Sequence, residues 1–152
     1  MKTKTDILLE LWIEARTRFR NQLPAITEED IKKTLSPSKN SIGFLIRHIG
    51  DVELLFAKNV FGASNLKVSA KTVIAQHDTG EWTNRKELED YVTQSFKALK
   101  TIVEKQTDTD WETTITTKEF GTKTKAEAFG RIISHTTYHA GQIAIINKYG
   151  SV

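Results

Sequence analysis

The sequence contains no cysteine, and that absence excludes several kinds of chemistry. A disulfide framework, a protein thiolate nucleophile and a cysteine-ligated metal all need that side chain. Proline is almost as scarce, since only Pro24 and Pro37 occur and both lie in the first quarter. Because proline interrupts helices, the remainder of the chain is free to form long ones.

Strong charge of one sign and long apolar runs are also missing. Lys and Arg number 22 against 19 Asp and Glu, and no dense basic cluster accompanies this small excess, so a nucleic-acid partner is not indicated. No apolar run approaches the ~20 residues of a membrane span. The first five residues lead into a helical pattern with acidic residues, not into an apolar signal core. We therefore expect a soluble, cytoplasmic protein with neither a nucleic-acid nor a membrane partner.

The 152 residues suit one globular domain, and 38% hydrophobic residues suffice for a single core. No repeat or linker divides the chain, so we expect one domain over residues 1–152. Apolar residues recur at i, i+3, i+4 and i+7, the pattern of amphipathic helices, in four segments. These segments are residues 5–19, 41–60, 84–106 and 125–149.

The segments between these helices are irregular in pattern. Residues 63–83 form a long connection, with a short helix expected near Val73. Residues 107–124 are rich in threonine and suit either a short extended ribbon or a loop. Asn40 or Ser41 caps the second long helix, while Gly62 and Gly150 end the second and fourth. The pattern predicts an all-α fold, a four-helix bundle with one long crossover connection.

Three of the four histidines lie on predicted helix faces. His135 and His139 are four residues apart on the fourth helix, in line with Ile132 and Ile143. Residues at this spacing share one side of a helix, so two imidazoles can reach a single metal ion. His48 lies near the edge of the apolar face of the second helix. If these two helices are neighbours, three imidazoles converge.

Three neutral nitrogen ligands leave at least one coordination position for water or substrate, which is the arrangement of a catalytic metal site. Imidazole suits Zn, Ni, Cu, Fe or Co, so the ligand set alone does not determine the metal. A buried hydrogen-bond network is the alternative interpretation, because buried imidazoles without a partner would cost a few kcal/mol each. The spacing favours the metal site.

Two further residues are weak candidates for catalysis. Asp51, one turn beyond His48, either orients a ligand or is a solvated charge beside Arg47, the interpretation that we favour slightly. Tyr138 lies between the two histidines of the fourth helix, where it either donates a proton or packs. Packing is the simpler role.

Glu53 points to the other edge of the helix that carries Asp51 and is a weaker candidate for orienting a ligand. His77 belongs to the long connection, where we expect an exposed loop histidine. A metalloprotease His-Glu-x-x-His motif, a phosphate-binding glycine loop, a nucleophile elbow and a di-iron Glu-x-x-His pair are all missing.

Two short runs resemble the DinB-like superfamily, which includes the damage-inducible DinB proteins and the YfiT-type metal-dependent enzymes. They are Ile46-Arg47-His48-Ile49 on the second helix and His135-Thr136-Thr137-Tyr138-His139-Ala140-Gly141-Gln142-Ile143 on the fourth. The resemblance implies a DinB/YfiT-like four-helix bundle. It also implies that His48, His135 and His139 bind one divalent transition metal per chain, nickel or zinc, and that the protein forms a homodimer.

The resemblance further implies a reaction. Relatives include transferases and isomerases that use bacillithiol, mycothiol or glutathione-type cofactors. We therefore expect a metal-dependent thiol transferase that acts on small electrophiles, with a low-molecular-weight thiol that compensates for the lack of cysteine. A metal-dependent hydrolase and a non-catalytic stress-response protein that binds the metal for stability are the alternatives.

Overall fold

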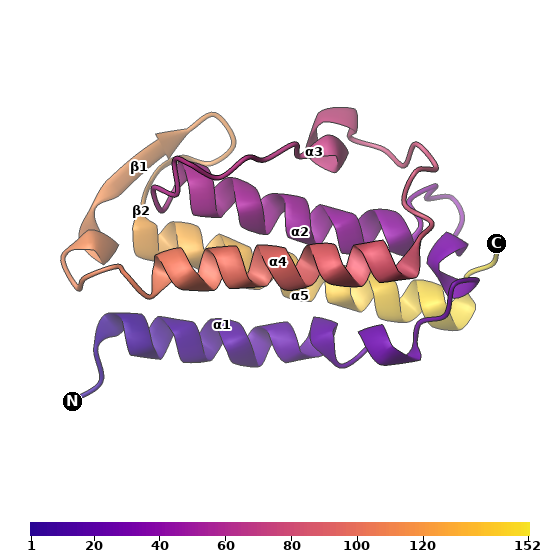
Figure 1. Ribbon diagram of the computed structural model, residues 1–152, viewed down its shortest axis with the longest axis horizontal. Coiled ribbons are helices and arrows are strands. Elements are labelled where there is room, and N and C mark those ends of the chain that lie inside the picture. The colour runs from indigo at the N-terminus through magenta and orange to yellow at the C-terminus, as the bar shows by residue number, and fades with distance from the viewer.

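Four long helices run side by side along the length of the molecule (Figure 1). The computed structural model describes all residues from Met1 to Val152. The long helices are α1 (Lys4–Arg20), α2 (Ile42–Asn59), α4 (Arg85–Val103) and α5 (Lys125–Tyr149). Helix α2 packs against α4 and α5, and α1 packs against α5. The predicted all-α bundle is thus confirmed. None of its helices is both long and apolar enough to cross a membrane.

Short elements fill the connections. The long connection between α2 and α4 contains the short helix α3 (Lys71–Ala75), which includes Val73, where a short helix is expected. The threonine-rich segment is an extended ribbon rather than a loop, because β1 (Thr114–Thr117) pairs antiparallel with β2 (Gly121–Thr124). Three single turns of 3-10 helix complete the chain: η1 (Leu23–Ala25), η2 (Asp30–Lys32) and η3 (Asp110–Glu112).

Each long helix begins at a polar side chain that accepts a hydrogen bond from the backbone N–H three residues later. The caps are Thr3, Ser41, Asn84 and Thr124. Such a bond satisfies one of the N–H groups that have no partner within the helix. Of the two candidates for α2, Ser41 is the cap.

Two large apolar clusters form the core, one toward each end of the bundle. The first includes Phe19, Ile49, Trp82, Val92 and Ile143. The second includes Trp12, Leu99, Trp111, Phe129 and Ile132. Buried polar residues also join the helices: Glu53 accepts from Arg16 at 2.7 Å and from Ser95 at 2.6 Å. Glu53 therefore connects α2 to α1 and α4 and does not take part in a histidine site.

Two glycines of α2 allow neighbouring segments to approach closely. A Cβ on Gly43 would lie 1.9 Å from the carbonyl oxygen of Trp82, at the end of the long connection. A Cβ on Gly50 would lie 2.7 Å from the ring of Tyr91 on α4. The missing side chains thus let the connection and Tyr91 lie directly against the helix that carries His48.

We predict that Gly43→Ala lowers the free energy of unfolding by about 2 to 3 kcal/mol, because the new methyl group collides with backbone rather than with a flexible side chain. Gly130→Ala is the matched control, since its Cβ meets nothing within 4 Å. There the better helix former should raise stability by up to about 1 kcal/mol. Urea unfolding of both variants checks the prediction, and equal effects would contradict it.

Candidate metal centre

The packing of α2 against α5 brings the three predicted histidines together. One nitrogen from each of His48, His135 and His139 lies within 4.8 Å of the other two. The Nε2 atoms of His48 and His135 are 3.1 Å apart. The ring centroids of His135 and His139, one turn apart on α5, are separated by 4.4 Å.

The two histidines of α5 lie beside the most buried line of that helix, not on it. Thr136 and Ala140, each one position further along, are buried, whereas both histidines are half-buried. The reason is the 100° step between successive residues, which turns the imidazoles toward the edge of the interface. Both histidine side chains therefore remain partly accessible to solvent.

Hydrogen bonds at Nδ1 distinguish the three rings. Nδ1 of His48 lies 3.0 Å from the hydroxyl of Thr72, and Nδ1 of His139 lies 2.6 Å from Oε1 of Gln142. Nδ1 of His135 is buried without a partner. Metal-binding histidines commonly donate one ring N–H to a protein oxygen and present the other nitrogen to the metal. Two of the three rings have that arrangement.

The surroundings keep all three imidazoles neutral near pH 7. Burial, with a smaller contribution from the charge of His139, lowers the pKa of His48 to about 4. Burial, with the charges of both other histidines, lowers the pKa of His135 to about 3. Burial also lowers the pKa of His139. Neutral imidazole is the form that binds metals, so the cluster is ready to ligate without losing protons.

This donor set fits a transition metal. Two nitrogen ligands at ~2.05 Å from a tetrahedral zinc lie about 3.3 Å apart, close to the 3.1 Å between the Nε2 atoms of His48 and His135. Three neutral nitrogens also match zinc, nickel, copper, iron or cobalt better than the hard cations, which prefer oxygen. The cluster can therefore hold a metal and leave a coordination position open.

A cavity of about 410 Å³ adjoins the three histidines. Helices α2, α3 and α5 and the β1–β2 turn surround it. Its apolar walls are Val52, Leu55, Phe56, Val60, Val73 and Phe120. Its other polar lining residues are Asn59, Thr117, Glu119 and Tyr138. The volume lies within the range of small-molecule sites.

Glu119 is a lining residue that the sequence pattern did not indicate. It lies in the turn between β1 and β2, and its carboxylate pairs with Arg131 of α5 at 3.2 Å. Both side chains remain largely exposed, so this ion pair contributes little to stability and can open. Tyr138 also lines this region: it is 65% exposed, and its ring centroid lies 5.1 Å from that of His139.

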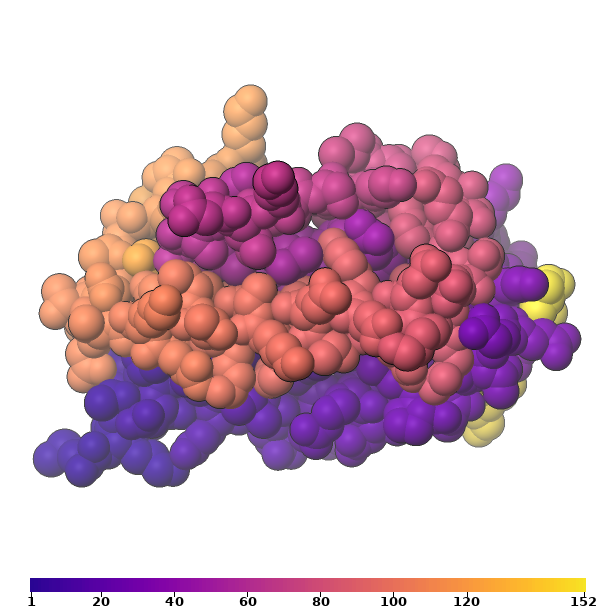
Figure 2. Space-filling model, viewed as in Figure 1, coloured from indigo at the N-terminus to yellow at the C-terminus, as the bar shows by residue number.

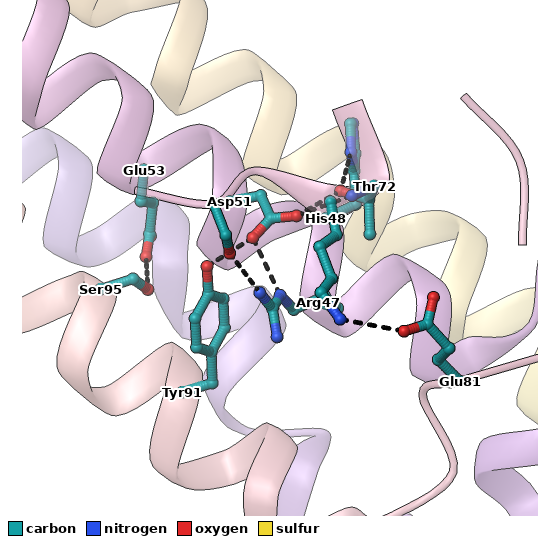
Figure 3. A network of polar contacts seen from close by, with 10 residues as sticks. Arg47, His48, Asp51, Glu53, Thr72, Glu81, Tyr91 and Ser95 are labelled. Carbon is teal, nitrogen blue, oxygen red and sulfur yellow. Dashed lines mark hydrogen bonds and ion pairs between the residues drawn. The ribbon is translucent and has the colours of Figure 1, made fainter. Parts of the chain in front are cut away.

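The expectation that Asp51 is a solvated charge is wrong. Asp51 is fully buried, and Figure 3 shows its carboxylate at the centre of a network with Arg47, Thr72 and Tyr91. The long connection folds back over α2 and covers this carboxylate, which the helical pattern alone did not reveal. His77, by contrast, is an exposed loop residue, as expected.

The family model of the DinB superfamily matches residues 8–143 of this chain. The chain belongs to the DinB superfamily. A comparison with curated protein sequences finds no match.

Two solved structures share the DinB fold at low sequence identity. One is a mycothiol-dependent maleylpyruvate isomerase, 14% identical, with a TM-score of 0.72 over 94% of this chain. The present chain spans 63% of the length of that isomerase. The other is a conserved protein from Enterococcus faecalis, 17% identical, with a TM-score of 0.68 over 97% of each chain.

We predict that the stability of the metal-free protein rises between about pH 4 and pH 6.5. In this range the unfolded chain, with a histidine pKa near 6.5, binds protons that the folded site excludes. His135→Gln should reduce the slope by up to about 1.4 kcal/mol per pH unit. Urea unfolding at several pH values measures it. His77→Gln, which removes an exposed histidine outside the cluster, is the control variant, and a slope in His135→Gln as steep as in His77→Gln would refute the prediction.

Proposed function

We propose that this protein is a metal-dependent transferase that joins a low-molecular-weight thiol to small electrophilic molecules. The observation that carries the proposal is the cluster of three neutral imidazoles that line a cavity. A structural site would surround its metal with protein ligands, whereas three ligands beside a cavity leave room for a reactant.

In this proposal His48, His135 and His139 hold one divalent ion, nickel or zinc. Such an ion lowers the pKa of a bound thiol or water, so that the nucleophile exists at neutral pH. The chain has no cysteine, so a thiol nucleophile must come from a cofactor. The thiol-dependent isomerase that shares the fold supports this choice of cofactor class.

The cavity walls favour a substrate with an apolar body. Val52, Phe56 and Phe120 contribute side chains that exclude water without hydrogen bonding. Asn59 and Tyr138 provide polar atoms at the same cavity and are suited to orienting a carbonyl or hydroxyl group. Such walls select size and shape, while the imidazoles define where the reactive atom must lie.

A metal-dependent hydrolase is the second candidate, and Glu119 is the observation that favours it. The helix faces offer no free carboxylate, but the β1–β2 turn places Glu119 in the lining of the same cavity. A carboxylate there is suited to accept a proton from water. Its present partner is Arg131, so a hydrolase would require that this exposed pair separates.

We expect tag-free protein to bind about one zinc or nickel ion per chain, and His48→Ala and His139→Ala to lose it while remaining helical. Elemental analysis after dialysis measures the metal, and far-UV circular dichroism follows the fold. His77→Ala should retain the metal. A wild-type protein that cannot be loaded with zinc or nickel would refute the metal-dependent function and leave a buried histidine network.

For the cobalt-loaded protein, we expect glutathione to produce new near-ultraviolet absorption and to slow chelator removal of the ion, because a thiolate enters the open position. Methionine, which lacks an ionisable thiol, is the control. If instead thiols have no effect and ester hydrolysis depends on both the ion and Glu119, with Glu119→Gln losing activity at unchanged metal content, the hydrolase is correct.

A further inference from the structure

The long connection between α2 and α4 is fastened onto the helix that carries His48. In the space-filling view, residues of this connection form the upper rim of the molecule above α4 (Figure 2). Its Asp78 accepts from the backbone N–H and the hydroxyl of Ser41, and its Ser69 accepts from Arg47 at 3.1 Å. With the close approach of Trp82 to Gly43, these contacts hold α3 in place over α2.

Thr72, on α3, is buried at the point where this connection meets Asp51. Asp51 Oδ2 accepts from the Thr72 backbone N–H at 2.9 Å and from the Thr72 hydroxyl at 2.8 Å. Its Oδ1 accepts from Arg47 Nε at 2.9 Å and from the hydroxyl of Tyr91. A carboxylate with four donors fixes the direction of every one of these hydrogen bonds, because each hydrogen points toward Asp51.

The direction of the Thr72 bond determines the protonation of the His48 ring. Since the Thr72 hydroxyl donates its only hydrogen to Asp51, its oxygen can only accept from His48 Nδ1, 3.0 Å away. A neutral imidazole that carries its hydrogen on Nδ1 has its lone pair on Nε2. That atom faces His135 and the centre of the cluster.

We propose that Asp51 and Thr72 are positioning residues that hold His48 as its Nδ1–H tautomer and aim Nε2 into the histidine cluster (Figure 3). The long connection is thereby part of the site although none of its residues belongs to the histidine cluster. The tautomer assignment stands on the hydrogen bonds alone. Its consequence, a higher metal affinity, rests on the proposed function.

The tautomer is tested first, on metal-free protein with 15N-labelled imidazoles. Long-range 1H–15N correlation at pH 7 distinguishes Nδ1–H from Nε2–H, and the His48→Gln variant assigns the signals. We expect Nδ1–H in the wild type and in Thr72→Ser, which keeps the hydroxyl. Thr72→Val removes the acceptor, so His48 should shift toward Nε2–H. A wild-type ring that carries its hydrogen on Nε2, or an unchanged tautomer in Thr72→Val, would overturn the proposal.

The consequence is tested by zinc affinity in competition with a chelator. Loss of an oxygen acceptor behind a metal-binding histidine weakens binding about 10- to 100-fold, which is the effect expected for Thr72→Val. Thr72→Ser should stay within about 3-fold of the wild type. Thr136→Val is the matched control, because that threonine is buried between the two histidines of α5 but its hydroxyl has no partner. Its affinity should not change.

The two tests separate the two claims. Wild-type affinity in Thr72→Val, or equal losses in Thr72→Val and Thr136→Val, would overturn the positioning role. A wild type that holds the Nδ1–H tautomer but binds no zinc, nickel or cobalt would overturn the proposed function and leave the hydrogen-bond assignment supported. Because the wild-type tautomer is measured without any Thr72 variant, the proposal remains testable even if Thr72→Val does not fold.

Discussion

The buried carboxylate of Asp51 connects three separate parts of the fold. Its hydrogen-bond partners come from α2, from α3 in the long connection and from α4, and they include the guanidinium of Arg47 stacked 3.7 Å from the ring of Tyr91. Burial of an unpaired carboxylate would cost far more than any single contact returns. The fold must therefore bring all these donors together, and by doing so it determines where Thr72 lies relative to His48. Gly50 makes the arrangement possible, because a side chain there would displace Tyr91.

The sequence predicted the parts of the site that follow helical periodicity and missed the parts that depend on tertiary folding. His135 and His139 could be placed on one face because a helix repeats every 3.6 residues, and α5 has the predicted bounds. Asp51 was misjudged because its partners Thr72 and Tyr91 lie 21 and 40 residues away in the sequence. Glu119 lies in the turn between β1 and β2, where no helical periodicity relates its position to those of the histidines. A local sequence pattern specifies on which face of a helix a residue lies. Whether that residue is buried depends on which distant segment of the chain covers the face.

The three histidines are not equivalent, and the difference follows from where each ring lies. His48 and His139 each have an oxygen behind Nδ1, so hydrogen bonding orients them. His135 has no partner at Nδ1, and its Nε2 lies 3.1 Å from Nε2 of His48. The pKa of His135, about 3, lies below that of His48, about 4, because burial and the charges of His139, His48 and Arg131 all lower it, whereas the charge of Asp51 raises the pKa of His48. The site thus combines two rings whose Nδ1 atoms have protein oxygen partners with one ring whose Nδ1 atom has none.

The lowered pKa values of the histidines relate metal binding to the stability of the fold. Neutral, poorly solvated imidazoles near one another oppose folding at acidic pH, because the unfolded chain gains protons that the folded site cannot accept. An ion that binds only the folded arrangement shifts the equilibrium toward the native state by RT ln(1 + [L]/Kd), about 4 kcal/mol at a thousandfold excess over Kd. The imidazoles that stay neutral in the metal-free protein are the ones that would bind the ion. The pH dependence of stability and the affinity for a metal therefore depend on the same cluster.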